Sequence, residues 1–145
     1  MNQLHRLQDL VQVARDGAAF YEYALQRVED DRLRGLFAQM AAAKRELIDG
    51  LSGVLATSGE EAPGGGTLSG SLKQRIGQVT AALSGDRERS YILQLEQVED
   101  RLLDHMQLAI GDTDDPVLMS LLENYLPKMR TCHDQMQALK QRTAA

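Results

Sequence analysis

The sequence predicts an all-α protein, a four-helix bundle of the ferritin-like type with an additional short helix in the crossover between its second and third long helices. Three observations lead to this prediction. Helix-favouring Leu, Ala, Gln, Glu and Arg are abundant, whereas β-branched residues are sparse and scattered. Apolar residues recur at alternating intervals of three and four in four long segments. A single long connection that contains Pro63 and three glycines interrupts this pattern.

The first two long helices are expected at residues 4–28 and 31–57. The first carries an unbroken apolar stripe, and the small residues 17–19 at its middle would let a neighbouring helix approach closely. Asp30 and Asp31 separate the two helices and can cap the second. The second stripe includes a charged residue, because it runs Phe37, Met40, Lys44, Leu47 and Leu51.

The connection at about residues 58–67 leads into a short helix, expected at residues 68–83. The third long helix is expected at 86–110, with Gly111 as its terminator. Asp115 followed by Pro116 is a start signal for the last helix, which extends to about residue 142. Pro127 lies inside that last pattern and predicts a kink rather than an end. All 145 residues fit one domain.

Composition and charge exclude several classes of function. The net charge of −5 argues against nonspecific binding of nucleic acid or anionic membranes. No apolar run approaches the roughly 20 residues of a membrane span, and the polar start of the chain does not resemble a signal peptide. Cys132 is the sole cysteine, which fits a reducing compartment. We therefore expect a cytoplasmic protein.

Four short strings, in this order, resemble a bacterial ferritin-like family classed as a domain of unknown function. They are Asp16-Gly17, Gly64-Gly65-Gly66-Thr67, Glu96-x-x-Glu99-Asp100, and Leu126-Pro127 followed by His133-Asp134. The resemblance extends from about residue 7 to residue 139. It implies a ferritin-like bundle and a cytoplasmic location, and it implies no reaction, because that family has no established activity.

A di-iron or di-manganese centre is the first chemistry to weigh. Such bundles use one Glu from each of two helices and Glu-x-x-His from each of the other two. This chain contains no Glu-x-x-His, and the nearest approximations are Glu46-x-x-Asp49 and Arg130-x-x-His133. The candidate ligands for iron or manganese are Glu22, Glu46, Glu96, Glu99 and His133.

Lys44 argues against that centre, because it occupies the level of the second stripe where a carboxylate ligand would lie. Glu99 lies within the third stripe at a similar depth, and Glu96 is one turn away. Since an isolated buried charge is costly, we expect Lys44 to form an ion pair with Glu99 or Glu96. Glu22 or His133 would complete the network. The sequence therefore favours a degenerate metal site held by ion pairs.

A set of soft donors on the last helix is a second alternative. Met129, Cys132 and Met136 recur at spacings of three and four, so they share one face, and thioethers with a thiol suit Cu(I). The competing interpretation is an ordinary core, in which Met fills irregular gaps. A buried Cys among Met and Leu also keeps a high pKa and low reactivity.

Two functional hypotheses follow. The first is a non-enzymatic helical protein, without a cofactor, that acts through self-association or a protein partner. The second is a metalloprotein, with a di-iron or di-manganese oxidase-like centre or a Cu(I) site. Paired apolar positions beside the main stripes offer more apolar surface than four helices need to bury, so we expect a homodimer. These positions are Leu36, Phe37, Leu102 and Leu103.

Overall fold

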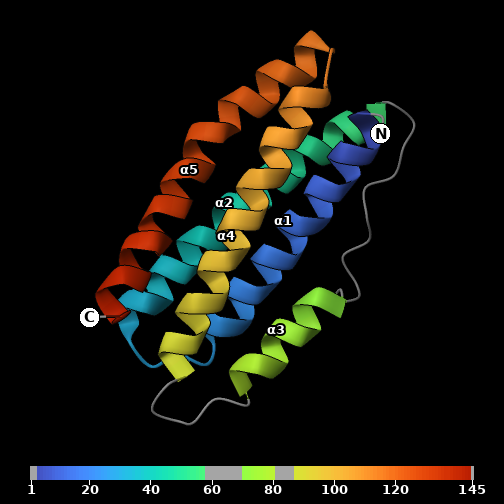
Figure 1. The fold of residues 1–145 in the computed structure, drawn as a ribbon. Coiled ribbons are helices and arrows are strands. Elements are labelled where there is room, and N and C mark those ends of the chain that lie inside the picture. The colour runs from blue at the N-terminus through green and yellow to red at the C-terminus, as the bar shows by residue number, and fades with distance from the viewer. Residues whose placement is uncertain (1–2, 58–69, 81–86, 145) are drawn as a thin grey trace.

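A computed structural model describes residues 3–57, 70–80 and 87–144, all of which lie in five helices or their short connections (Figure 1). The helices are α1 (Gln3–Leu25), α2 (Asp31–Thr57), α3 (Gly70–Thr80), α4 (Arg87–Asp112) and α5 (Pro116–Ala144). The predicted all-α bundle, with a short helix between its second and third long helices, is confirmed. The predicted connection at residues 58–67 lies outside the described residues.

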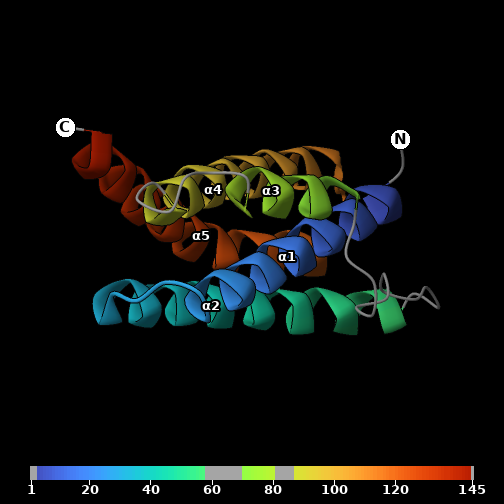
Figure 2. The ribbon, with the colours of Figure 1, turned by 90° about the horizontal axis from the view of Figure 1, so that it is seen from below.

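The four long helices form the bundle, and α3 lies on its outside. α1 packs against both α2 and α4, α4 packs against α5, and α2 meets α5 over a shorter stretch. α3 packs against α4 and the adjoining side of α1. Figure 2 shows α1 between α2 on one side and α3 and α4 on the other. None of the described helices combines the length and apolarity that crossing a membrane requires.

Two helix ends differ from the prediction. α1 ends at Leu25 rather than Val28, but Val28 remains in the core, and its backbone N–H donates a hydrogen bond of 3.0 Å to Ala24 O. Gly111 does not terminate α4, which continues to Asp112. The backbone of Gly111 is not left-handed, so this glycine does not form the expected cap. Residues 68–69 and 81–83, predicted as ends of the short helix, lie outside the described part, as does residue 86.

The predicted start signals work through side-chain capping. Asp30 Oδ1 accepts hydrogen bonds from the backbone N–H groups of Arg32 at 2.8 Å and Leu33 at 3.3 Å, so Asp30 rather than Asp31 caps α2. Asp115 caps α5 in the same way through the N–H groups that follow Pro116. α5 passes through Pro127 as one helix.

The apolar stripes form a single core, and small residues bring the helices together near its centre. A Cβ atom on Gly17 would lie 3.1 Å from Val98 Cγ1 and 3.9 Å from Lys44 Cγ. A larger residue at this position of α1 would therefore crowd the side chains of α2 and α4. Phe37 and Leu102 are buried in this core. Leu36 and Leu103, the other two residues on which the homodimer prediction was based, are partly buried against it.

Candidate metal site

A buried ion pair lies at the centre of the bundle. Lys44 Nζ of α2 contacts Glu99 Oε1 of α4, and neither residue has exposed surface. The Tyr21 hydroxyl of α1 donates a hydrogen bond of 2.8 Å to the same Glu99 oxygen. Lys44 Nζ also lies 5.3 Å from the centroid of the Tyr21 ring. The structure thus brings together Lys44 and Glu99, the charged residues at the middle of the apolar stripes of α2 and α4.

Burial and charge both act on the groups around this pair. Burial, together with the Glu99 carboxylate, raises the pKa of Tyr21 well above its ordinary value. Burial also raises the pKa of the Cys132 thiol on α5, against the opposing effect of Lys44. Tyr21 and Cys132 therefore complete the surroundings of the pair. The expectation that Glu22 or His133 would do so is wrong, because both form their ion pairs elsewhere.

The glutamates proposed as di-metal ligands do not meet. Glu22 pairs with Arg45 at 2.5 Å and Glu46 pairs with Lys128, and their side chains are 45% and 59% exposed. Each follows or precedes a buried stripe residue by one position, which rotates its side chain by about 100° around the helix. Together with Glu96 and Glu99, they form four separate pairs with four different cations. These four glutamates are therefore not brought together as ligands of the di-iron or di-manganese centre that was the alternative interpretation of the sequence.

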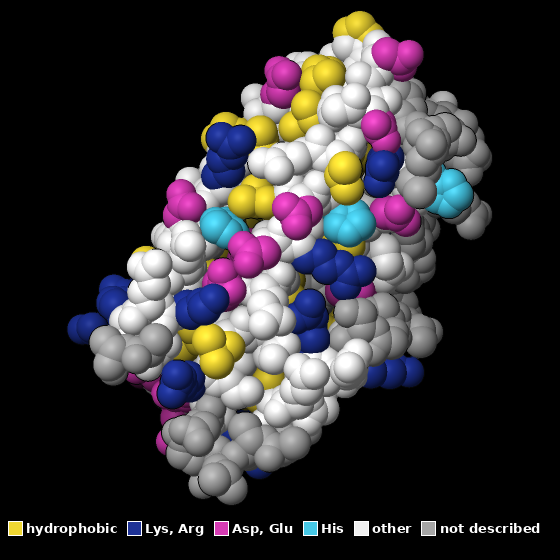
Figure 3. All heavy atoms as spheres, in the orientation of Figure 1, with side chains coloured by type: hydrophobic (Ala, Val, Ile, Leu, Met, Phe, Trp, Pro, Cys, Tyr) yellow, Lys and Arg dark blue, Asp and Glu magenta, His cyan; other side chains and the backbone are white. Residues whose placement is uncertain are grey.

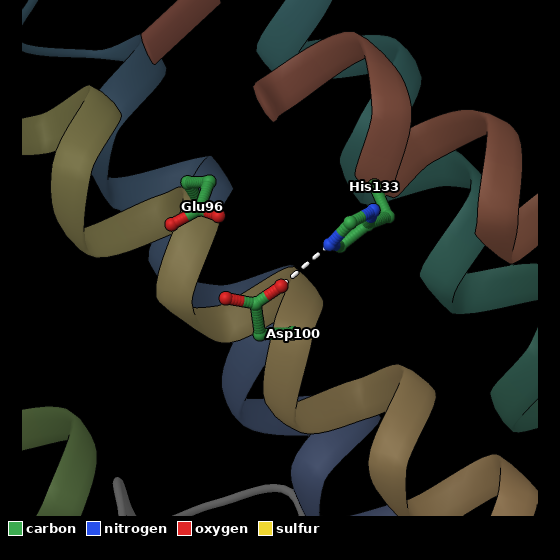
Figure 4. A group of neighbouring side chains, drawn as sticks. All are labelled: Glu96, Asp100 and His133. Atoms are coloured by element: carbon green, nitrogen blue, oxygen red, sulfur yellow. Dashed lines mark hydrogen bonds and ion pairs between the residues drawn. The ribbon is translucent and has the colours of Figure 1, made fainter. Parts of the chain in front are cut away.

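Potential metal donors converge at a different place, between α4 and α5. Glu96, Asp100 and His133 each offer one ligand atom, and these atoms lie within 4.8 Å of one another (Figure 4). Glu96 and Asp100 are one turn apart on α4, so their side chains share a face. His133 reaches them from α5, and its Nε2 lies 2.5 Å from Asp100 Oδ1. Among the described residues, this is the one group of at least three His, Cys, Asp or Glu side chains whose ligand atoms lie this close together.

The three donors span the boundary between core and solvent. Glu96 is buried, His133 is half-buried and Asp100 is exposed. Figure 3 shows a histidine flanked by acidic side chains on the face formed by α4 and α5. The Glu96 carboxylate is therefore on the core side of the group, and the Asp100 carboxylate is on its solvent side.

Two further charged residues adjoin the donors. His133 Nδ1 lies 3.2 Å from Asp134 Oδ1, and Lys140 Nζ lies 3.3 Å from Glu96 Oε2. Burial lowers the pKa of His133, but hydrogen bonds to Asp134 and Asp100 outweigh that effect and raise it overall. Lys140 is the lysine that pairs with Glu96, and His133 lies between the carboxylates of Asp100 and Asp134.

Sequence reasoning found Glu96 and His133 but missed Asp100 as a donor. The signal was available in part, because Asp100 follows Glu96 by four residues on the same helix. That spacing on α4 does not indicate that His133 of α5 faces Glu96 and Asp100. Their meeting depends on how α4 and α5 are rotated and shifted against each other.

The soft-donor alternative lies in the core. Met129 and Met136 have no exposed surface and Cys132 is 6% exposed, so all three lie on the inner face of α5. Lys44 lies close enough to Cys132 to influence its pKa. An ammonium group beside the thiol opposes the entry of a cation, so this arrangement favours the core interpretation over a Cu(I) site.

Comparisons with known proteins place the chain in a family and support its fold. The solved structure of CopM in the Cu(II)-bound form is similar to this one, with a TM-score of 0.76 and 14% sequence identity, over 98% of this chain and 97% of that chain. No curated protein matches the sequence. The family described as "Domain of unknown function (DUF2383)" matches residues 2–112. This chain therefore belongs to the DUF2383 family.

Proposed function

We propose that this protein binds one divalent transition-metal ion, Cu(II) most tightly, through Glu96, Asp100 and His133. The observation that carries the proposal is the convergence of three ligand atoms from two helices to within 4.8 Å. One imidazole nitrogen and two carboxylate oxygens form a donor set that suits Cu(II), Ni(II) and Zn(II). Among these ions, Cu(II) is generally bound most tightly by nitrogen and oxygen ligands.

The surroundings of His133 fit this role. Metal-binding histidines usually have a hydrogen-bond partner on their second ring nitrogen, which orients the ring. Asp134 lies at that position, 3.2 Å from Nδ1, and Nε2 faces Asp100. An imidazole nitrogen binds a metal only in its unprotonated form, so Nε2 would serve as the ligand while an Nδ1–H group donates to Asp134.

The likeness to CopM supports the proposal at the level of the fold. A bundle of similar architecture is recorded in a Cu(II)-bound form, so the architecture is compatible with copper binding. The ligands proposed for this chain come from its own geometry and not from that likeness. We propose binding rather than catalysis, and the homodimer, the protein partner and the cytoplasmic location remain predictions.

Calorimetric titration of chelator-treated protein with Cu(II), in the presence of glycine as a weak competitor, tests the proposal. We expect one equivalent to bind, with large losses of affinity in Glu96→Gln, Asp100→Asn and His133→Gln. Asp134→Asn should weaken binding about 10-fold, as expected for a residue that orients a ligand. His105→Gln is the matched control, since it removes a half-buried histidine of α4 that lies outside the group of donors.

Two outcomes of the Cu(II) titration would contradict the proposal. If Cu(II) fails to bind stoichiometrically, or if its affinity is the same in the wild-type protein and in His133→Gln, the site is not a metal site. Stoichiometric iron or manganese retained through gel filtration would instead revive the di-metal interpretation.

A further inference from the structure

Lys140 faces the same carboxylate that the proposed metal ion would use. Its Nζ lies 3.3 Å from Glu96 Oε2, and it follows His133 by seven residues, or about two turns, on α5. The Glu96 side chain is only 5% exposed, whereas the Lys140 side chain is 42% exposed. Lys140 thus reaches from solvent toward a carboxylate that is itself buried.

This arrangement makes Lys140 and a bound metal ion competitors. A buried carboxylate needs a compensating positive charge, which Lys140 provides when no metal is present. A metal at Glu96 would supply that charge instead, and the two cations would repel each other. Because its side chain is partly exposed, Lys140 can turn its ammonium group into water while its aliphatic stem stays on the surface. Because the metal ion would itself supply the compensating charge, displacement of Lys140 would not leave the buried Glu96 carboxylate unpaired.

Competition from a lysine affects different metals to different degrees. Mn(II), Mg(II) and Ca(II) are held mainly by charged oxygen ligands, and Lys140 offsets one of the two carboxylate charges available here. Cu(II) also gains strongly from the His133 imidazole, which Lys140 does not touch. Repulsion by Lys140 should therefore exclude Mn(II) while Cu(II) still binds.

From this geometry we infer that Lys140 determines metal selectivity, by acting as a displaceable cation that keeps hard divalent ions out of the Glu96–Asp100–His133 site. This inference rests on the proposed function and concerns the same site. Lys140 is a selectivity residue in this account and not a ligand.

The test compares the affinities for Mn(II) and Cu(II) in wild-type protein, Lys140→Met and Lys140→Arg. Lys128→Met is the matched control, because Lys128 is also a half-exposed α5 lysine paired with a glutamate, but with Glu46 of α2. Dissociation constants are measured by calorimetry for Cu(II) and by the loss of the free-ion electron paramagnetic resonance signal for Mn(II). Circular dichroism establishes that each variant is folded, and Lys140→Gln replaces Lys140→Met if the latter is not.

We expect Lys140→Met to raise the Mn(II) affinity at least about 10-fold and the Cu(II) affinity by clearly less, while Lys140→Arg and Lys128→Met keep the wild-type ratio. If wild-type protein binds Cu(II) but the ratio of the two affinities is unchanged in Lys140→Met, the inference is wrong and the proposed function stands. If only Lys140→Met binds metal, Lys140 is not displaceable, and both the proposed function of the wild-type protein and the selectivity role of Lys140 fail. If neither binds any metal, both are overturned.

Discussion

Lys44 and Glu99 depend on each other because neither side chain reaches solvent. Lys44→Met should strand the Glu99 carboxylate and lower the free energy of unfolding by about 3–5 kcal/mol. Adding Glu99→Gln should recover most of this loss, since the amide is neutral and can still accept the Tyr21 hydrogen bond. Urea unfolding in chelator-treated buffer measures both changes. Unchanged stability in Lys44→Met would contradict the buried pair.

Tyr21 adds a pH-dependent contribution to the same centre. Its pKa in the folded protein is raised well above the ordinary value of 10.0, so the folded chain holds the phenolic proton more tightly than the unfolded chain does. That contribution is complete below pH 10 and is lost as the pH rises through the folded pKa.

We therefore expect the stability of the wild-type protein to fall more steeply above pH 10 than that of Tyr21→Phe. Below that pH, Tyr21→Phe should itself cost about 1.5–3 kcal/mol, because it removes a hydrogen bond to a charged group. Urea unfolding from pH 8 to pH 11 measures both effects. Parallel pH profiles for the two proteins would show that Tyr21 is not held in its protonated form.

At the scale of the helices, the apolar periodicity correctly predicted the burial of charged residues within a stripe. It did not predict where the side chains next to a stripe lie. Lys44 and Glu99 each replace an apolar residue within a stripe, so their burial could be read from spacing alone. Glu22 and Glu46 lie one position from a stripe, and the structure places both at the surface. The meeting of Asp100 with His133 depends on the fit between two helices, which no single-helix pattern contains.

The start of α5 offers a test at this scale. Asp115 accepts backbone hydrogen bonds from Val117 at 2.9 Å and Leu118 at 3.4 Å. Asp115→Ala should therefore cost about 1 kcal/mol of stability, and Asp115→Asn should cost clearly less because it keeps an acceptor at the cap. Thermal unfolding of the two variants compares them. Equal losses would mean that the cap contributes through its charge rather than through its hydrogen bonds.

For the molecule as a whole, the structure separates two regions that the sequence suggested as one. The centre of the bundle holds Lys44 and Glu99, where a di-metal protein would bind its ions. The potential donors for a single ion lie farther out, in the partly open site between α4 and α5. The interior thus contains a buried lysine whose positive charge opposes the entry of cations, while the outer group of donors includes a histidine and an exposed carboxylate.

The most direct test of this account is pulsed electron paramagnetic resonance of the protein loaded with one equivalent of Cu(II). The chain has three histidines, of which only His133 is a ligand in the proposed site. The wild-type spectrum should show coupling to the remote nitrogen of a single imidazole. The coupling should disappear in His133→Gln and persist in the variant with both Lys44→Met and Glu99→Gln. An imidazole signal that survives in His133→Gln, or one that is absent from the wild-type protein, would contradict the account.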